Sequence, residues 1–162
     1  MDETIQVTRI HLTSRKAQAL IDALNAELSA TYPEEGANHF DLDAAEVAPG
    51  RGAFLVVQAG HETLGCGAVR LIEGGAAEVK RMFVVPSARG RGISRRILTA
   101  LEDEARALGA TQVVLETGVR QAAALGLYVN AGYVRIEAFG EYVDSPLSVC
   151  MAKELVASNN DL

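Results

Sequence analysis

The chain has 162 residues, of which 49% are hydrophobic and 22% are charged, and its formal net charge at pH 7 is −6. These values predict one globular domain over 1–162 and argue against a general nucleic-acid or membrane-surface binder, because such partners reward a positive face. No apolar stretch reaches the roughly 18 residues that a membrane span needs, and the start MDETIQV does not resemble a secretory signal. A cytoplasmic location is therefore expected.

The chain offers few metal-ligating or redox-active side chains. Cys66 and Cys150 are too few for a disulfide scaffold or a structural zinc site, and each lies in a strand-like run where a thiol serves as a small hydrophobe. His11, His39 and His61 are scattered, with no spacing that suggests a metal site or a nucleophile partner. No bound metal is expected.

The first third of the chain predicts a strand, a helix and an irregular segment. Alternation and β-branched residues indicate a strand over 5–12. Ser14 can cap a helix that follows, because apolar residues recur there at helical spacing: Ala17, Leu20, Ile21, Leu24 and Leu28. From 31 to 51 prolines and glycines break the pattern, which indicates a surface loop with a short helix near 43–47.

The next segment predicts an antiparallel meander of three strands. Apolar runs over 54–58 and 62–71 are separated by a short turn, and Glu73-Gly74-Gly75 forms a second turn. A third strand over 76–85 ends at Pro86, which lacks the N–H that a central strand needs.

The remaining elements alternate between helix and strand. A 3.6-residue apolar period predicts a helix over 93–108 ending near Gly109, and 121–131 reads as a second helix stopped by Gly132. Strands are expected over 112–117, 133–139 and 147–151. The order β-α-β-β-β-α-β-α-β-β predicts an α/β fold with a mixed sheet.

The segment SARGRGISRRIL, residues 87–98, joins a predicted strand to a predicted helix. Unpaired N–H groups at the start of that helix would point out of the turn, and Gly90 and Gly92 would let an anion approach the backbone. With positive potential from Arg89 and Arg91, the loop is interpreted as a phosphate cradle. Two plainer readings stay open: glycines needed only for a tight turn, and arginines on a solvated helix face.

Better-known phosphate loops do not fit this segment. The G-x-x-x-x-G-K pattern followed by Ser or Thr is absent, and Arg95 stands where a dinucleotide fingerprint has its third glycine. ATP and NAD are therefore disfavoured as ligands.

Instead, Arg89-Gly90-Arg91-Gly92-Ile93-Ser94 resembles the acetyl-CoA signature Q/R-x-x-G-x-G/A of the GNAT superfamily of N-acetyltransferases. Ser94 departs from the usual final Gly or Ala, although its small hydroxyl could bond a phosphate oxygen. The stretch LETGVRQAAALGLYVNAGY, 115–133, is similar to the second half of the GNAT cofactor site, so the resemblance covers 78–133. The ending FGEYVDSPLSVCMAKEL resembles small bacterial members, some labelled indole-acetic-acid acetyltransferases.

The resemblance implies a sheet of about seven strands, splayed between the fourth and fifth, with about four flanking helices. The pantetheine arm of acetyl-CoA would lie in the splay against backbone groups of Met82, Phe83 and Val84. Its pyrophosphate would lie on the backbone amides of Arg89, Gly90, Arg91, Gly92, Ile93 and Ser94. Gln121 stands where the family often has an Asn that touches the cofactor, or it is simply a polar residue at a helix start.

Acetyl transfer to an amine needs a base, because an alkylamine with a pKa near 10.4 is almost fully protonated at neutral pH. Glu116 is the first candidate and Glu78 the second; either could instead be a strand carboxylate paired with an arginine such as Arg81 or Arg120. Tyr128 matches the family's tyrosine beside the cofactor sulfur and could protonate the leaving thiolate. Alternatively, Tyr128 only packs on one helical face with its neighbours.

The expected reaction is direct transfer from acetyl-CoA to a primary amine of a small molecule or peptide, with a backbone amide near Val84 holding the oxyanion. A route through an acetyl-cysteine is disfavoured because neither cysteine has an activating neighbour. Tyr142, Asp144 and the segment 31–51 are expected to flank the acceptor. The alternatives are a non-catalytic acyl-CoA-binding or sensor module and a binder of another phosphate ligand. Because dimers are common among similar proteins, a homodimer is an open expectation.

Overall fold

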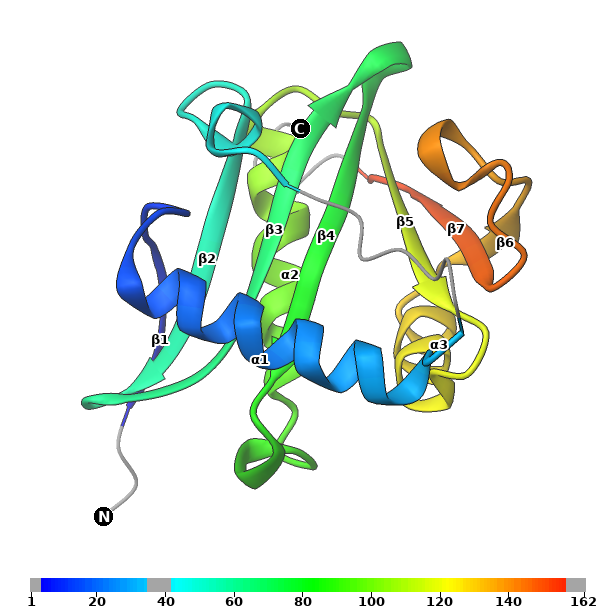
Figure 1. Ribbon diagram of the computed structural model, residues 1–162. Coiled ribbons are helices and arrows are strands. Elements are labelled where there is room, and N and C mark those ends of the chain that lie inside the picture. Colours follow the sequence, from blue (N-terminus) through cyan, green and yellow to red (C-terminus); the bar gives the residue numbers. More distant parts are fainter. Residues whose placement is uncertain (1–3, 35–41, 157–162) are drawn as a thin grey trace.

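The computed structural model describes residues 4–34 and 42–156, and these residues form one seven-stranded sheet with helices on both faces (Figure 1). The strand order is β1-β2-β3-β4-β5-β7-β6. The strands are β1 (Ile5–Arg9), β2 (Gly52–Ala59), β3 (Glu62–Ile72), β4 (Ala76–Val84), β5 (Gln112–Gly118), β6 (Val134–Ile136) and β7 (Ser148–Glu154). The α-helices are α1 (Arg15–Thr31), α2 (Ile93–Ala107) and α3 (Ala122–Asn130), and short 3-10 turns include η1 (Ala44–Val47) and η4 (Gly140–Tyr142).

The two faces of the sheet carry separate apolar cores. On one face, Phe54 and Val56 of β2 pack with Leu20 of α1; on the other, Leu55 and Val57 pack with Ile97 of α2. Successive side chains of a strand point to opposite faces. Because both faces are covered by helices, the apolar run of β2 is continuous rather than alternating.

The predicted helix signals act as expected. Ser14 caps α1, since its Oγ accepts a hydrogen bond from the Ala17 backbone N–H at 3.3 Å. The helix α2 ends at Ala107, and Gly109 follows with a φ of +86°, in the left-handed region that favours glycine at a helix end. Among the described helices, none combines the length and hydropathy that crossing a bilayer requires.

The strands β4 and β5 pair in parallel for only four residues each. Their register runs from Ala76 with Gln112 to Val79 with Leu115, although β4 continues to Val84 and β5 to Gly118. Beyond this point the two strands diverge (Figure 1), while β5 stays paired with β7 along its whole length. The splay predicted between the fourth and fifth strands is confirmed.

A bulge in β4 lies at the beginning of the splay. The register between β3 and β4 shifts between Cys66 and Ala68, and Arg81 has a φ of +57°, which is uncommon for a residue other than glycine. The contacts that hold this conformation include a hydrogen bond from the Arg81 guanidinium to Asn25 Oδ1 at 3.1 Å and one from Cys66 Sγ to the Arg81 carbonyl at 3.3 Å. Left-handed geometry at Arg81 interrupts the alternation of side chains along β4.

The structure differs from the predicted elements mainly at their ends. β1 stops at Arg9, because the chain turns between His11 and Ser14, where the Ser14 N–H bonds the His11 carbonyl. β6 has three residues, since only Val134–Ile136 pair with β7, which itself extends to Glu154. The expected short helix near 43–47 is present as η1, whereas 35–41 of the predicted loop lie outside the described residues.

Gly65 on β3 has no room for a side chain. A Cβ there would lie 2.6 Å from the Phe83 carbonyl oxygen and 3.1 Å from Ile97 Cδ1. Gly65→Ala is therefore expected to lower the free energy of unfolding, measured by urea denaturation, by about 1–3 kcal/mol.

Gly126 supplies the matched control, because it lies inside α3 and a Cβ there would meet nothing within 4 Å. Gly126→Ala should raise stability by about 0.5–1 kcal/mol through its helix propensity. Equal effects of the two substitutions would contradict the assigned packing of β3 against β4 and α2.

Candidate active site

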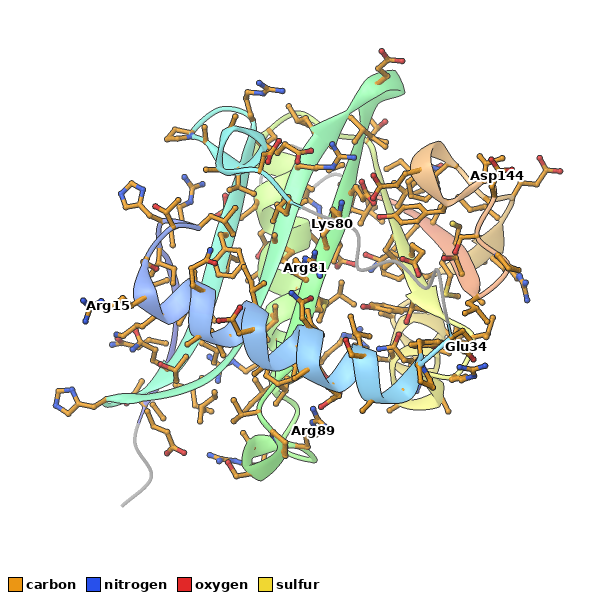
Figure 2. The ribbon with its side chains drawn as sticks, in the orientation of Figure 1. Arg15, Glu34, Lys80, Arg81, Arg89 and Asp144 are labelled. Carbon is orange, nitrogen blue, oxygen red and sulfur yellow. The ribbon has the colours of Figure 1, made fainter. Side chains whose placement is uncertain are left out.

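The splay opens into a cavity of about 610 Å³. Its walls come from α1, β4, β5, α3, η4 and the segment that leads into β7. Figure 2 shows Lys80 and Arg81 on β4, with Glu34 beyond the end of α1 and Asp144 on the far side. Of the residues expected to flank the acceptor, Tyr142, Asp144, Tyr32 and Glu34 line this cavity.

Glu116 lines the cavity from β5, just beyond the last residue that pairs with β4. Burial raises its pKa to about 7; a hydrogen bond from the Ser148 hydroxyl acts in the opposite direction, and the nearby charge of Glu78 raises the pKa further. A carboxylate with a pKa near neutrality takes up and releases protons in the range where a general base is most effective.

Tyr128 reaches the cavity from α3, on the opposite side of the sheet from Glu78. Its hydroxyl donates to Met82 Sδ of β4 at 3.6 Å, and its ring packs edge-to-face on Tyr133 with centroids 5.8 Å apart. Burial and the charge of Glu116 raise the pKa of Tyr128, so the phenol is protonated at neutral pH. Because a thioether is a weak acceptor, this hydroxyl is poised to donate to a stronger one.

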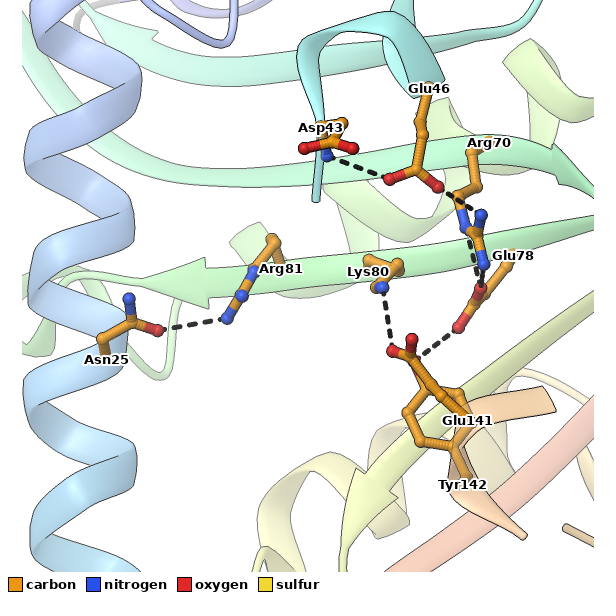
Figure 3. Close-up of polar contacts among 9 residues, drawn as sticks. All are labelled: Asn25, Asp43, Glu46, Arg70, Glu78, Lys80, Arg81, Glu141 and Tyr142. Atoms are coloured by element: carbon orange, nitrogen blue, oxygen red, sulfur yellow. Dashed lines mark hydrogen bonds and ion pairs between the residues drawn. The ribbon is translucent and has the colours of Figure 1, made fainter. Parts of the chain in front are cut away.

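Glu78 is 1% exposed and fully engaged in a buried network (Figure 3). Its carboxylate accepts from Arg70 Nε at 2.9 Å and from the Tyr142 hydroxyl at 2.6 Å, and Arg70 also pairs with Glu46 of η1. An arginine partner was one expectation for this strand carboxylate, but the partner is Arg70. The predicted hairpin could have identified this partner, since Arg70 and Glu78 are directly opposite in the register of β3 and β4.

Gly90 and Gly92 have φ angles of +78° and +74°, and a Cβ at either position would meet no atom within 4 Å. Gly92 is also the N-cap of α2 and has no side chain to satisfy the amides of the first turn. The loop therefore presents open backbone donors, as a phosphate site requires. The Arg89 side chain turns toward α1 instead: its guanidinium pairs with Glu27 at 2.6 Å and bonds the Val84 carbonyl at 2.9 Å.

Gln121 turns its side-chain carbonyl back onto β5. Its Oε1 accepts from the Gly118 backbone N–H at 3.0 Å and from the Thr117 hydroxyl at 3.4 Å, while the residue still lines the cavity. Next to it, the Tyr32 hydroxyl accepts from the Arg120 backbone N–H at 3.0 Å. These contacts join the end of α1 to the loop between β5 and α3, and nothing local in the sequence indicates them.

Both cysteines are buried and free. Burial raises the pKa of Cys66 to about 12 and also raises that of Cys150, so neither thiol is ionised at neutral pH. Among the described residues, no three His, Cys, Asp or Glu side chains form a cluster that could hold a metal.

The Tyr142 hydroxyl is the second donor to the buried Glu78, so removing it should destabilise the protein. Tyr142→Phe is expected to lower the free energy of unfolding in urea by about 1–3 kcal/mol. The control is Val143→Ala, because the neighbouring Val143 side chain is exposed. This substitution should change the free energy of unfolding by less than about 0.5 kcal/mol. A loss no greater than that of the control would show that Glu78 does not depend on Tyr142.

A pKa of about 7 for Glu116 also predicts a pH dependence of folding. Because this pKa is higher in the folded than in the unfolded chain, the stability present at low pH is lost as the pH rises toward and through 7. Glu116→Gln should therefore match the wild type in stability near pH 5 and exceed it by about 2 kcal/mol near pH 8. The exposed Glu62→Gln is the control, and equal pH profiles of wild type and Glu116→Gln would refute the shifted pKa.

Comparison with known proteins agrees with this geometry. A curated "IAA acetyltransferase" from Azospirillum brasilense is 46% identical over 137 residues, which is 84% of this chain and 88% of the relative. A solved structure from Klebsiella pneumoniae, assigned to the acyl-CoA N-acyltransferases, is 35% identical with a TM-score of 0.81 and covers 94% of this chain and 99% of that one.

A Bacillus subtilis acetyltransferase solved in complex with CoA shares the fold, with 15% identity, a TM-score of 0.67 and coverage of 94% of this chain and 100% of that one. The model of the acetyltransferase (GNAT) family matches residues 17–133, a range that includes most of α1, the splay, the glycine loop and α3. The chain therefore belongs to the GNAT acetyltransferase family.

Proposed function

We propose that this protein transfers the acetyl group of acetyl-CoA directly to a primary amine of a small molecule or peptide. The observation that supports this most is that Glu116 of β5 and Tyr128 of α3 line one cavity, one suited to accept and the other to donate a proton. The name of the Azospirillum relative is in keeping with acetyl transfer. A cytoplasmic location belongs to the same proposal, because acetyl-CoA is a cytoplasmic metabolite.

The chain offers a suitable binding site for a long ligand with a diphosphate. Beyond Val79 the β4 edge is not paired with β5, so the part of β4 that includes Met82 and Phe83 borders the splay, and its backbone could bond amide groups of a pantetheine arm. The amides from Gly90 to Ser94 lie at the uncapped start of α2, where the helix dipole favours an anion, whereas the Arg89 amide donates to the Pro86 carbonyl at 3.3 Å. Gln121 lies at the start of α3 on the cavity wall, near the proposed path of that arm.

When bound, acetyl-CoA supplies an acetyl group activated as a thioester. Glu116, directly or through water, takes the proton of the acceptor amine, while Tyr128 gives its proton to the departing sulfur. A backbone amide near Val84 stabilises negative charge on the carbonyl oxygen. Glu78 keeps η4 in place through Tyr142, a positioning role that leaves Glu116 as the proposed base.

Tyr128→Phe tests this assignment. Without the phenolic proton, kcat for thiol release from acetyl-CoA in the presence of an amine panel should fall by about two orders of magnitude. The Kd for CoA, measured by isothermal titration calorimetry, should stay unchanged because the substitution leaves the proposed diphosphate-binding site at the start of α2 intact.

Two results would overturn the proposal. Unchanged thiol release with intact CoA binding would remove Tyr128 from catalysis, and no turnover by the wild type with any amine would favour an acyl-CoA-binding or sensor module. Titrations with ATP and NAD serve as controls, since preference for either over CoA would indicate a different phosphate ligand.

A further inference from the structure

Two consecutive cations line the cavity, which a regular strand would not allow. Side chains i and i+1 of a strand point to opposite faces. At Arg81, however, the φ of +57° and the bulge interrupt the alternation, and both Lys80 and Arg81 border the same cavity (Figures 2 and 3). The backbone of β4 thus adopts an uncommon conformation that brings two positive charges to one wall.

Lys80 is deeply buried for a cation, since its side chain is 5% exposed. A buried ammonium needs an anion nearby. Its neighbour on the same face, Glu78, is already bonded by Arg70 and Tyr142, and the Lys80 ammonium lies 3.3 Å from Glu141 Oε1. One anion that meets Lys80 in the cavity is therefore a carboxylate from η4, and the Lys80 charge also acts on Glu46 and Glu116.

Glu141 is a replaceable partner for this lysine. It lies on a short turn, its side chain is 44% exposed, and its oxygen is 3.3 Å from the ammonium, longer than the usual charge-assisted bond. If Glu141 turned outward, solvent could hydrate its carboxylate fully. An incoming carboxylate could then bond Lys80, with the Arg81 guanidinium adding positive potential.

Building on the proposed acetyl transfer, we infer that the acceptor is a primary amine that also carries a carboxylate. The carboxylate binds Lys80 in place of Glu141, and the amine reaches Glu116 across the splay. Lys80 is then a specificity-determining residue. Its ammonium selects amino-acid-like acceptors over plain amines, and the exposed acids Glu34 and Asp144 also line the cavity.

The test compares each amino acid with its decarboxylated amine: phenylalanine with 2-phenylethylamine, leucine with 3-methylbutylamine, and tyrosine with tyramine. With saturating acetyl-CoA, kcat/KM is measured for both members of each pair in the wild type and in Lys80→Met. For each enzyme, the ratio is kcat/KM of the amino acid divided by kcat/KM of its decarboxylated amine. Because the two amines of a pair differ in basicity, the decisive quantity is this ratio in the wild type divided by the same ratio in Lys80→Met. Loss of a charge-assisted pair should make this quotient about tenfold or larger.

Three further variants sharpen the result. Lys80→Arg should retain the preference for the carboxylated amine, and Glu141→Gln should lower KM for that amine alone by removing its intramolecular competitor. Lys16→Met removes an exposed lysine of α1 outside the cavity and should leave the ratio unchanged. Unaltered CoA affinity and melting temperature in Lys80→Met would establish that the fold is intact.

A binding assay separates this inference from the proposed reaction. The same pairs are titrated into the CoA-bound wild type and into CoA-bound Lys80→Met. Tighter binding of the carboxylated member to the wild type only would support the role of Lys80 even if no amine is acetylated. A quotient near one together with equal affinities in the titration would overturn the inference, whatever the outcome for acetyl transfer.

Discussion

The early end of the pairing between β4 and β5 is the constraint on which the rest of the site depends. Four residue pairs hold the two strands together, and after Val79 and Leu115 they separate. A parallel sheet would otherwise pair these backbone groups along the full strand length. The separation leaves polar backbone exposed inside the protein, a cost that folded chains accept only where another group satisfies it.

The splay also explains why so many charges lie inside this small domain. Glu78, Lys80 and Glu116 occupy the inner part of the sheet, where apolar side chains would normally lie. Their surroundings give them different properties. Glu78 has two strong donors and is fixed, whereas the Glu116 carboxyl is partly buried, accepts from the Ser148 hydroxyl and holds its proton up to near neutral pH. Similar carboxylates on adjacent strands thus meet different surroundings.

Much of the architecture could be predicted from the sequence because the responsible signals are local. The Ser14 cap, the period of α2 and the glycines of the loop each act within a few residues, and the order of elements is as predicted. The splay was expected only through the family resemblance, since no residue of β4 or β5 signals where pairing ends. Strand ends were less accurate: β6 is limited by the three residues that find partners on β7.

The candidate site was predictable in part. Glu116, Tyr128 and Gln121 all line the cavity, as expected from motif positions. The partners that determine their chemistry were not predicted: Ser148 is on another strand, and Glu141 is sixty-one positions from Lys80 along the chain. The left-handed Arg81 was also missed, because arginine carries no preference for that conformation, and its contacts with Asn25 and Cys66 come from distant parts of the chain.

The close approach of Tyr32 to Gly118 has a consequence for how this chain can change. A Cβ on residue 118 would lie 1.8 Å from the Tyr32 hydroxyl oxygen, which also accepts the Arg120 backbone N–H. Any side chain at 118 would have to expel the phenol ring, and loss of the ring would leave the Arg120 amide without that acceptor. Substitutions at positions 32 and 118 are thus expected to occur together. The evolution of the end of α1 is therefore coupled to that of the loop after β5.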